Sequence, residues 1–202
     1  MYKKINTFIF DCFGVILDPL VMGWYKENRL KYGFVDDNIS SFLKEVDLGN
    51  ASEDDIVDYF MKYDGVNLTK EEMREDIDSH LKLDNNLANI IKKLKEKGFK
   101  TVLLSNANAS VFERKIYKTY PEFKNLFDDI IISSNIKMIK PNPDIYLYAL
   151  EKINLKAKES LFIDDSQKNV DGALNVGMQG FLYTDVDSFA EYISSLGINL
   201  ND

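Results

Sequence analysis

Residues 5–15 read Ile-Asn-Thr-Phe-Ile-Phe-Asp-Cys-Phe-Gly-Val. The first six residues are mostly β-branched or aromatic, which is typical of a strand that is covered on both faces. Asp11 stands where that strand is expected to end, and Gly14 allows the chain to turn sharply after it. The stretch therefore predicts a buried strand that presents a carboxylate at its carboxyl end.

From residue 85 onward, apolar runs alternate with segments of helical spacing. In one of these segments, Asn142 followed by Pro143 is typical of a helix start. The short apolar runs that we expect to be strands are 101–104, 130–132, 161–163 and 180–183. Strands that alternate with helices indicate a mostly parallel sheet with helices on both faces, so we predict an α/β fold.

Residues 18–82 interrupt this alternation, because they have helical spacing and no convincing strand. Within them, Ser52 is followed by three acidic residues, which predicts a capped helix start. We therefore expect a helical domain of residues 18–82 inserted into a core domain of residues 1–17 and 83–202.

The negative charge of the chain is concentrated in the predicted insert. Residues 36–78 contain 14 acidic and 4 basic residues, while the whole chain has a net charge of −8. A polyanion such as DNA would be repelled by this segment, so we expect no nucleic-acid partner. The acidic residues are better explained as the solvated outer face of a helical insert.

Composition also bears on the compartment of the protein. No run approaches the roughly 18 uninterrupted apolar residues of a membrane helix, so we expect no membrane partner. Residues 1–5 lead directly into strand-like sequence, without the features of a signal peptide. The single cysteine, Cys12, excludes an internal disulfide framework and a multi-cysteine zinc site. We expect a cytoplasmic protein; the sequence assigns no oligomeric state.

Further polar side chains stand at or just beyond the expected strand ends. Ser105 follows one strand, Asp164 and Asp165 follow another, and Lys140 precedes the helix that starts at Asn142. Ligands of open parallel sheets bind beyond the carboxyl ends of the strands. We therefore expect these side chains to converge with Asp11.

Each of these residues has an ordinary structural explanation when it is taken alone, as a turn, a cap or a solvated surface group. Together they suit phosphate chemistry. A carboxylate such as Asp11 can act as a nucleophile, and a hydroxyl beside free backbone N–H groups can hold a phosphoryl oxygen. Two adjacent carboxylates repel each other unless a cation neutralises them, and Mg²⁺ typically takes one or two carboxylates with waters and phosphate oxygens.

In their order along the chain, four stretches resemble the signature of the haloacid-dehalogenase-like (HAD) hydrolase superfamily: Asp11-Cys12-Phe13-Gly14-Val15, Leu103-Leu104-Ser105-Asn106-Ala107, Lys140-Pro141-Asn142 and Phe162-Ile163-Asp164-Asp165. The resemblance spans the whole chain. It implies a three-layer Rossmann-like parallel sheet core with a small inserted α-helical cap of the C1 type. Tyr120-Pro121-Glu122 and Met138 make the chain most similar to bacterial sugar-phosphate phosphatases, including a glucose-1-phosphate phosphatase.

The resemblance also implies a metal site. Asp11 would be both the nucleophile and a ligand of Mg²⁺, and the backbone carbonyl of Phe13 would be a second ligand. Asp165 would be a third ligand, with Asp164 close by and acting directly or through water.

The same resemblance implies how the substrate is held. Ser105 and Asn106 would bind the transferred phosphoryl group, and Lys140 would neutralise charge on the nucleophile and the phosphate. Asn169 would help to order the acidic loop. The expected function is a magnesium-dependent phosphatase that hydrolyses a small phosphomonoester, such as a sugar phosphate, through an aspartyl-phosphate on Asp11.

Phe13 departs from the family pattern, because most phosphatases of this family carry a second aspartate at this position. That acid protonates the leaving alkoxide, and general acid–base help is worth roughly 10²–10⁴-fold. The glucose-1-phosphate phosphatase type also lacks it.

The departure favours a rival, since L-2-haloacid dehalogenases carry an aromatic residue here. These dehalogenases use no metal. They need an arginine from the cap, and Arg29 is the candidate for it. The pair Asp164–Asp165 would be an unexplained repulsion in that mechanism. A third alternative is a catalytically silent binding protein that has kept the fold.

Overall fold

The first strand lies at the centre of a five-stranded parallel sheet with the order β3-β2-β1-β4-β5. The computed structural model describes residues 5–35 and 38–200; residues 1–4, where the predicted core domain begins, lie outside them, as do 36–37 and 201–202. The strands are β1 (Thr7–Phe10), β2 (Lys100–Ser105), β3 (Asp129–Ile132), β4 (Ser160–Asp164) and β5 (Gln179–Leu182). The predicted parallel α/β fold is confirmed.

Side chains of the sheet alternate between two apolar cores because successive residues of a strand point to opposite faces. In β1, Phe8 and Phe10 belong to one core, while Ile9 belongs to the other. Leu103 of β2 joins the first core and Val102 joins the second. Both faces of the sheet are therefore covered, which gives three layers.

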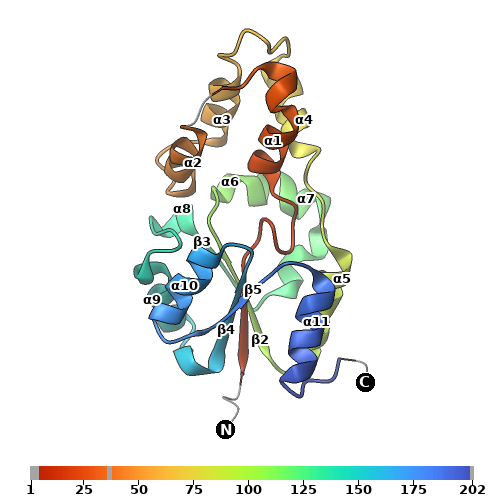
Figure 1. Cartoon of the computed structure of the whole chain (residues 1–202), viewed down its shortest axis with the longest axis vertical. Coiled ribbons are helices and arrows are strands. Elements are labelled where there is room, and N and C mark those ends of the chain that lie inside the picture. Colours follow the sequence, from red (N-terminus) through yellow and green to blue (C-terminus); the bar gives the residue numbers. More distant parts are fainter. Residues whose placement is uncertain (1–4, 36–37, 201–202) are drawn as a thin grey trace.

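Helices complete these layers and follow the predicted order. The helices α9 (Pro143–Lys152) and α10 (Gln167–Asn175) lie on one side of the sheet, and α5 (Asn85–Glu96) and α11 (Val186–Ser195) lie on the other (Figure 1). Both α10 and α11 begin three residues before their first buried apolar side chain, Val170 and Phe189. The first turn of each helix therefore contains no buried apolar side chain.

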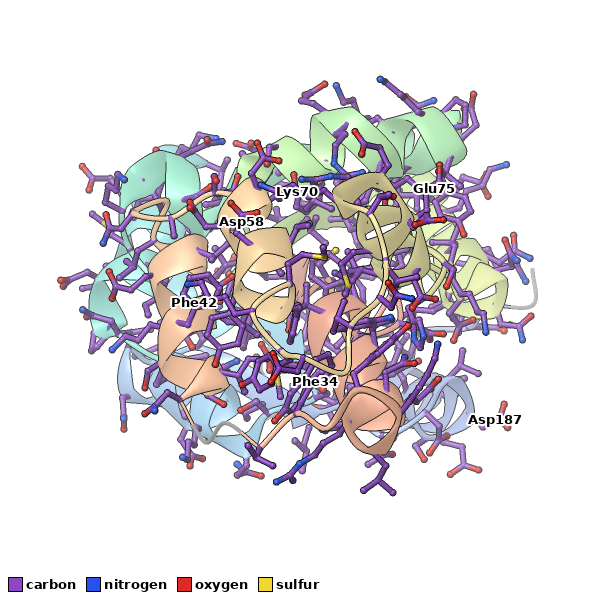
Figure 2. All side chains as sticks on the ribbon, turned by 90° about the horizontal axis from the view of Figure 1, so that it is seen from above. Phe34, Phe42, Asp58, Lys70, Glu75 and Asp187 are labelled. Atoms are coloured by element: carbon purple, nitrogen blue, oxygen red, sulfur yellow. The ribbon has the colours of Figure 1, made fainter. Side chains whose placement is uncertain are left out.

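Between β1 and α5 the described residues form four helices that cover one end of the molecule (Figures 1 and 2). They are α1 (Leu20–Tyr32), α2 (Ile39–Asp47), α3 (Glu53–Phe60) and α4 (Lys70–Asp78). Ser52 caps α3 as predicted, since its side chain accepts a hydrogen bond from the Asp55 N–H. The rings of Trp24, Phe34 and Phe60 pack together between these helices.

Residues 106–128 contain short helical pieces that the sequence did not predict. They are α6 (Ala109–Val111), the π-helical turn η1 (Phe112–Ile116), α7 (Tyr117–Thr119) and the 3₁₀ helix η2 (Pro121–Leu126). Two other short pieces are α8 (Ser133–Ile136), which follows β3, and η3 (Ala157–Glu159), which precedes β4. Among the described residues, no helix combines the length and the apolar character that crossing a membrane requires.

Candidate active site

The carboxyl ends of three neighbouring strands bring the predicted site residues together. Phe10 of β1 pairs with Ile163 of β4 in the sheet, so Asp11 lies beside Asp164. Ser105 is the last residue of β2 on the other side of β1. The predicted convergence at this edge of the sheet is what the structure shows.

An acidic cluster forms the centre of the edge. Asp11, Asp164 and Asp165 each offer a carboxylate oxygen, and these oxygens lie within 4.8 Å of one another. Lys140 reaches into the cluster from the loop before α9: its Nζ lies 2.6 Å from Asp11 Oδ1 and 2.8 Å from Asp164 Oδ2. Lys140, Asp11 and Asp164 are buried, so two carboxylates share one compact ammonium group away from water, while Asp165 is exposed.

The pKa values of the cluster reflect first its burial and then its charges. Burial raises the pKa of Asp11 to about 8, although Lys140 acts in the opposite direction. Burial and then the charge of Asp164 raise the pKa of Asp165. Burial alone would lower the pKa of Lys140, but its two carboxylate partners raise it above its ordinary value. The lysine stays charged, and the cluster keeps an excess of negative charge when its carboxyl groups ionise.

The donor set fits a hard divalent cation. Asp164 is already engaged, because its oxygens accept hydrogen bonds from Asn169 Nδ2, the Ser166 N–H and Lys140 Nζ. Asp11 accepts hydrogen bonds from Lys140 and from the Cys12 N–H, and within the described residues both of them reach Oδ1. Among the described residues, no hydrogen bond or ion pair from another residue reaches Oδ2 of Asp11 or the carboxylate of the exposed Asp165, so both are open to a cation. Mg²⁺ takes one or two carboxylates in such sites, which matches this pair.

Gly14 allows the loop after β1 to approach the loop after β4. Its φ is +90°, and a Cβ placed there would lie 2.3 Å from Asp165 Oδ2. Such a distance is far below van der Waals contact, and a positive φ is unfavourable for residues with a side chain. Glycine at this position keeps Asp165 next to Asp11.

The hydroxyl of Ser105 is fully buried beside the cluster. Within the described residues its Oγ has no hydrogen-bond partner other than the thiol of Cys12, and thiols are weak partners. A buried hydroxyl without a good partner costs roughly 1–3 kcal/mol. An incoming oxygen acceptor would satisfy it.

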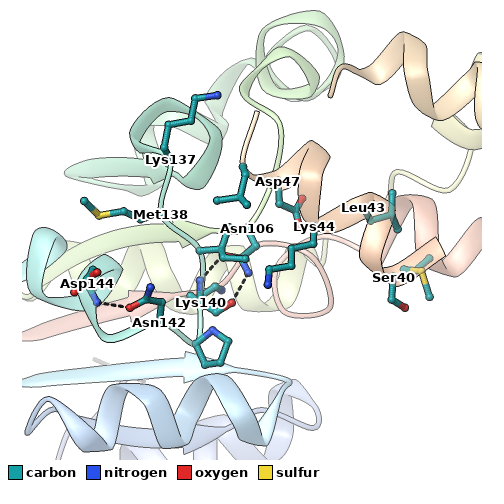
Figure 3. Close-up of a pocket in the computed structure, with 14 residues that line it drawn as sticks. Ser40, Leu43, Lys44, Asp47, Asn106, Lys137, Met138, Lys140, Asn142 and Asp144 are labelled. Carbon is teal, nitrogen blue, oxygen red and sulfur yellow. Dashed lines mark hydrogen bonds between the residues drawn. The ribbon is translucent and has the colours of Figure 1, made fainter. Parts of the chain in front are cut away.

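Asn106 is committed to the protein itself. Its Oδ1 accepts a hydrogen bond from the Lys140 N–H at 2.9 Å, and its Nδ2 donates to the Lys140 carbonyl at 3.0 Å. Figure 3 shows these two bonds side by side. Asn106 therefore holds the segment that carries Lys140.

Phe13 and Arg29 occupy very different places. The ring of Phe13 packs against Phe112 and lines a cavity beside the acidic cluster. Arg29 is exposed near the end of α1, its Nε donates to the Phe34 carbonyl, and it lines neither cavity at the site. The structure does not bring Arg29 to Asp11.

Two cavities open at the site. One, of about 710 Å³, lies between α2 and residues 137–144 and includes Lys140 and Asn106 (Figure 3). The other, of about 360 Å³, extends from Asp165 and Phe13 toward α1, α2 and α3. We call the second one the inner chamber. Most of its wall is apolar: Phe13, Pro19, Leu20, Val21, Met22, Leu43, Val46, Ile56, Ala107 and Val111.

Two residues near these cavities were missed by the sequence reasoning. Asp47, the last residue of α2, lines both cavities. Arg114, from η1, forms ion pairs with Glu53 of α3 and Asp78 of α4. No local sequence signal distinguishes either residue from ordinary surface charges, because their roles depend on how the four helices pack over the sheet.

Comparison with known proteins identifies the family. The model of the haloacid dehalogenase-like hydrolase family matches residues 5–177. The chain belongs to this family, and it is therefore a hydrolase with the three-layer fold described above.

Two curated relatives are informative. The chain is 30% identical over 109 residues to flavin mononucleotide hydrolase 1 of Arabidopsis thaliana, a match that covers 49% of this chain and 44% of the relative. It is 32% identical over 105 residues to a sesquiterpene phosphatase of Aspergillus oryzae, covering 52% and 53% of the two chains. The chain thus spans about half the length of these relatives.

A solved structure of similar shape is a HAD family enzyme of Bacteroides thetaiotaomicron. It has a TM-score of 0.76 at 20% identity, and the match covers 95% of this chain and 99% of that one. Another structure of the same enzyme is a magnesium complex, with a TM-score of 0.74 at 21% identity over 90% and 94% of the two chains. At this identity the likeness supports the fold.

Proposed function

We propose that this hydrolase is a magnesium-dependent phosphatase that transfers the phosphoryl group of a small phosphomonoester to Asp11. The observation that carries the proposal is the acidic cluster, in which Asp11 and Asp165 have open oxygens while Lys140 and Asp164 form a buried ion pair. Of the two curated relatives described above, one is named a flavin mononucleotide hydrolase and the other a sesquiterpene phosphatase, which supports the proposal.

The residues of this chain divide the proposed reaction among them. The carboxylate of Asp11 attacks phosphorus in line with the leaving oxygen, and an aspartyl-phosphate forms. The ammonium of Lys140 stabilises negative charge on the transferred group, and the Ser105 hydroxyl donates to one of its oxygens. Water then hydrolyses the aspartyl-phosphate.

The metal would be held by Asp11 and Asp165, by the backbone carbonyl of Phe13, and by Asp164 directly or through water. Bound there, Mg²⁺ supplies positive charge for the phosphoryl oxygens. Asn169 and the Ser166 N–H orient Asp164, and Asn106 positions Lys140. The chain thus supplies both the ligands and the residues that fix them.

We further propose that residues 18–82 act as a cap over a core of residues 1–17 and 83–202, and that the inner chamber receives the organic part of the substrate. Among the polar groups of the chamber, Asn106, Asn108 and Glu53 already bond to the protein. The apolar walls favour a compact apolar alcohol over the sugar that the family resemblance implies.

The rival reaction, metal-free dehalogenation through Asp11, draws support from the aromatic side chain at Phe13. It requires an arginine near the nucleophile, whereas Arg29 donates to the Phe34 carbonyl at the end of α1. It also leaves Asp165 without a role. Phosphoryl transfer accounts for both acidic residues at the end of β4.

Phosphate release tests the proposal directly. A panel of aryl, alkyl and sugar monophosphates is incubated with the wild type, with Asp11→Asn, and with the matched control Asp187→Asn, which changes an exposed aspartate of α11. Each reaction is run with Mg²⁺ and with a chelator.

We expect activity in the wild type and in Asp187→Asn that requires Mg²⁺, with apolar phosphates preferred, and none in Asp11→Asn. Phosphate release that survives chelation or Asp11→Asn would contradict the mechanism. Chloride release from 2-chloropropionate without metal would establish the rival, and turnover of neither class would favour a binding protein.

A further inference from the structure

Phe13 cannot donate a proton to the leaving group of the proposed reaction. Another residue in the walls of the two cavities carries an ionisable side chain. Four described residues line both cavities: Met22, Leu43, Asp47 and Asn106. Met22 and Leu43 have no acidic proton, and the amide of Asn106 is paired with the backbone of Lys140. Within this set, Asp47 is the residue that can exchange a proton with a bound substrate (Figure 3).

Polar side chains from the segments after β2 and β3 hold the backbone around Asp47 in place. Ser133 Oγ donates to the Asp47 carbonyl at 2.6 Å, Lys137 Nζ donates to the Gly49 carbonyl at 2.7 Å, and Asn108 Nδ2 donates to the Ala51 carbonyl at 3.1 Å. These three donors come from the segments that follow β2 and β3. The same edge of the sheet therefore positions both Asp47 and the acidic cluster.

The carboxyl group of Asp47 is able to hold a proton at neutral pH. Within the described part of the chain, no hydrogen bond or ion pair reaches its carboxylate oxygens. Burial raises the pKa of Asp47 to about 7, while the charge of Lys140 acts in the opposite direction. A general acid works best when its pKa is near the working pH.

Other charged groups share the two cavities with Asp47 and set its local potential. They are Lys44 on the same helix, Lys26 of α1, Glu53 of α3, Lys137, Lys140 and Asp144 from the segment 137–144, and Asp165 after β4. Glu53 is paired with Arg114, and Lys140 is paired with Asp11 and Asp164.

We propose that Asp47 is the general acid of this reaction and supplies from α2 the proton that Phe13 cannot provide. This inference rests on the proposed phosphatase function. As Asp11 forms its bond to phosphorus, the bond from phosphorus to the leaving oxygen breaks, and that oxygen keeps the electron pair and takes the proton of Asp47. Asp47 regains a proton from the water that hydrolyses the aspartyl-phosphate.

A leaving-group series tests the assignment. Phenyl phosphates that differ in their ring substituent have similar size but release phenols of different acidity. The kcat/KM of each substrate is measured with the wild type, with Asp47→Asn, and with Asp58→Asn, which changes a partly exposed aspartate of α3 that pairs with Lys70 and lines neither cavity. This parameter reports the steps up to release of the phenol, so hydrolysis of the aspartyl-phosphate does not affect it.

For p-nitrophenyl phosphate, whose leaving group needs no proton, we expect Asp47→Asn to stay within about threefold of the wild type. For unsubstituted phenyl phosphate we expect a loss of about 10²-fold or more, as for other general acids. Asp58→Asn should follow the wild type throughout. In the wild type, the ratio of kcat/KM for phenyl phosphate to kcat/KM for p-nitrophenyl phosphate should fall as the pH rises above about 7, because ionisation of Asp11 affects both substrates alike. This second measurement does not depend on how the variant folds.

A loss of equal size across the series would assign Asp47 a positioning or structural role and overturn the inference, as would no loss at all. Either result would leave the phosphatase function standing. If the wild type releases phosphate from none of these substrates, the result overturns both the role of Asp47 and the proposed phosphatase function.

Discussion

The side-chain amide of Asn106 forms two hydrogen bonds with the backbone of Lys140, one in each direction, at 2.9 and 3.0 Å. The lysine ammonium in turn lies 2.6 Å from Asp11. Asn106 thus links the end of β2 to the group that neutralises the nucleophile. The family resemblance implies that this asparagine binds the substrate, whereas its contacts make it a positioning residue.

We therefore expect Asn106→Ala to lower kcat/KM for the preferred phosphate ester about tenfold, because the backbone of Lys140 loses the two hydrogen bonds that hold it in place. It should also lower the free energy of unfolding by about 1–3 kcal/mol. Ser52→Ala is the control: it removes the cap of α3 at a cost of about 1 kcal/mol and should leave kcat/KM unchanged. Equal kinetics for the two variants would show that Asn106 acts on stability alone.

Magnesium should raise the melting temperature of the wild type. At a concentration one hundred times the Kd, a ligand that binds only the folded chain stabilises it by about 2.7 kcal/mol, or several degrees for a chain of this size. Asp165→Asn should abolish most of this shift, and Asp187→Asn should retain it. Thermal unfolding with and without Mg²⁺ measures the effect, and a full shift in Asp165→Asn would remove that residue from the metal site.

Gly14→Ala should impair the site more than it impairs the fold. The new Cβ would collide with the Asp165 carboxylate, and the backbone would be strained at its positive φ. Gly33→Ala is the matched control, since Gly33 also has a positive φ but no atom within 4 Å of a Cβ placed there. Both changes should cost about 1–2 kcal/mol of stability, while only Gly14→Ala should lose the magnesium shift and the activity. Retained metal binding in Gly14→Ala would contradict the close approach of the two loops.

The stability of Asp47→Asn should depend on pH in a defined direction. The pKa of Asp47 is raised from 3.8 to about 7, so the folded chain binds a proton more tightly than the unfolded chain does. The wild type therefore loses stability as the pH rises from about 4 to about 7, and the asparagine variant escapes this loss. We expect Asp47→Asn to melt at a higher temperature than the wild type at pH 8, with the difference shrinking toward pH 4. A difference that is independent of pH would place the carboxylate in water.

Much of the sheet and of the site at its edge could be predicted from the sequence, because these features depend on local patterns. Asp11 directly follows β1, Ser105 is the last residue of β2 and Asp164 is the last residue of β4, and a parallel sheet places such ends at one edge. The capped start of α3 at Ser52 was predictable for the same local reason. These features need only the residues next to them in the chain.

The rest depends on contacts between distant segments. Asp47 reaches the site because Ser133 and Lys137 hold the end of α2, more than 80 residues away in sequence. Arg114 is a similar case, since Glu53 and Asp78 meet it only after the helices have packed. No periodicity signals such long-range pairs, and the short helical pieces of residues 109–126 follow no regular apolar spacing.

The inner chamber also has a practical consequence for protein engineering. Its walls come largely from α1, α2 and α3, whereas Asp11, Lys140 and Asp165 stand on loops of the sheet. A mutant library that randomises Met22, Leu43 and Ile56 can therefore retune substrate choice while the catalytic edge stays intact. Gly14 should be held constant in every such library, because the two halves of the catalytic edge meet there without room for another atom.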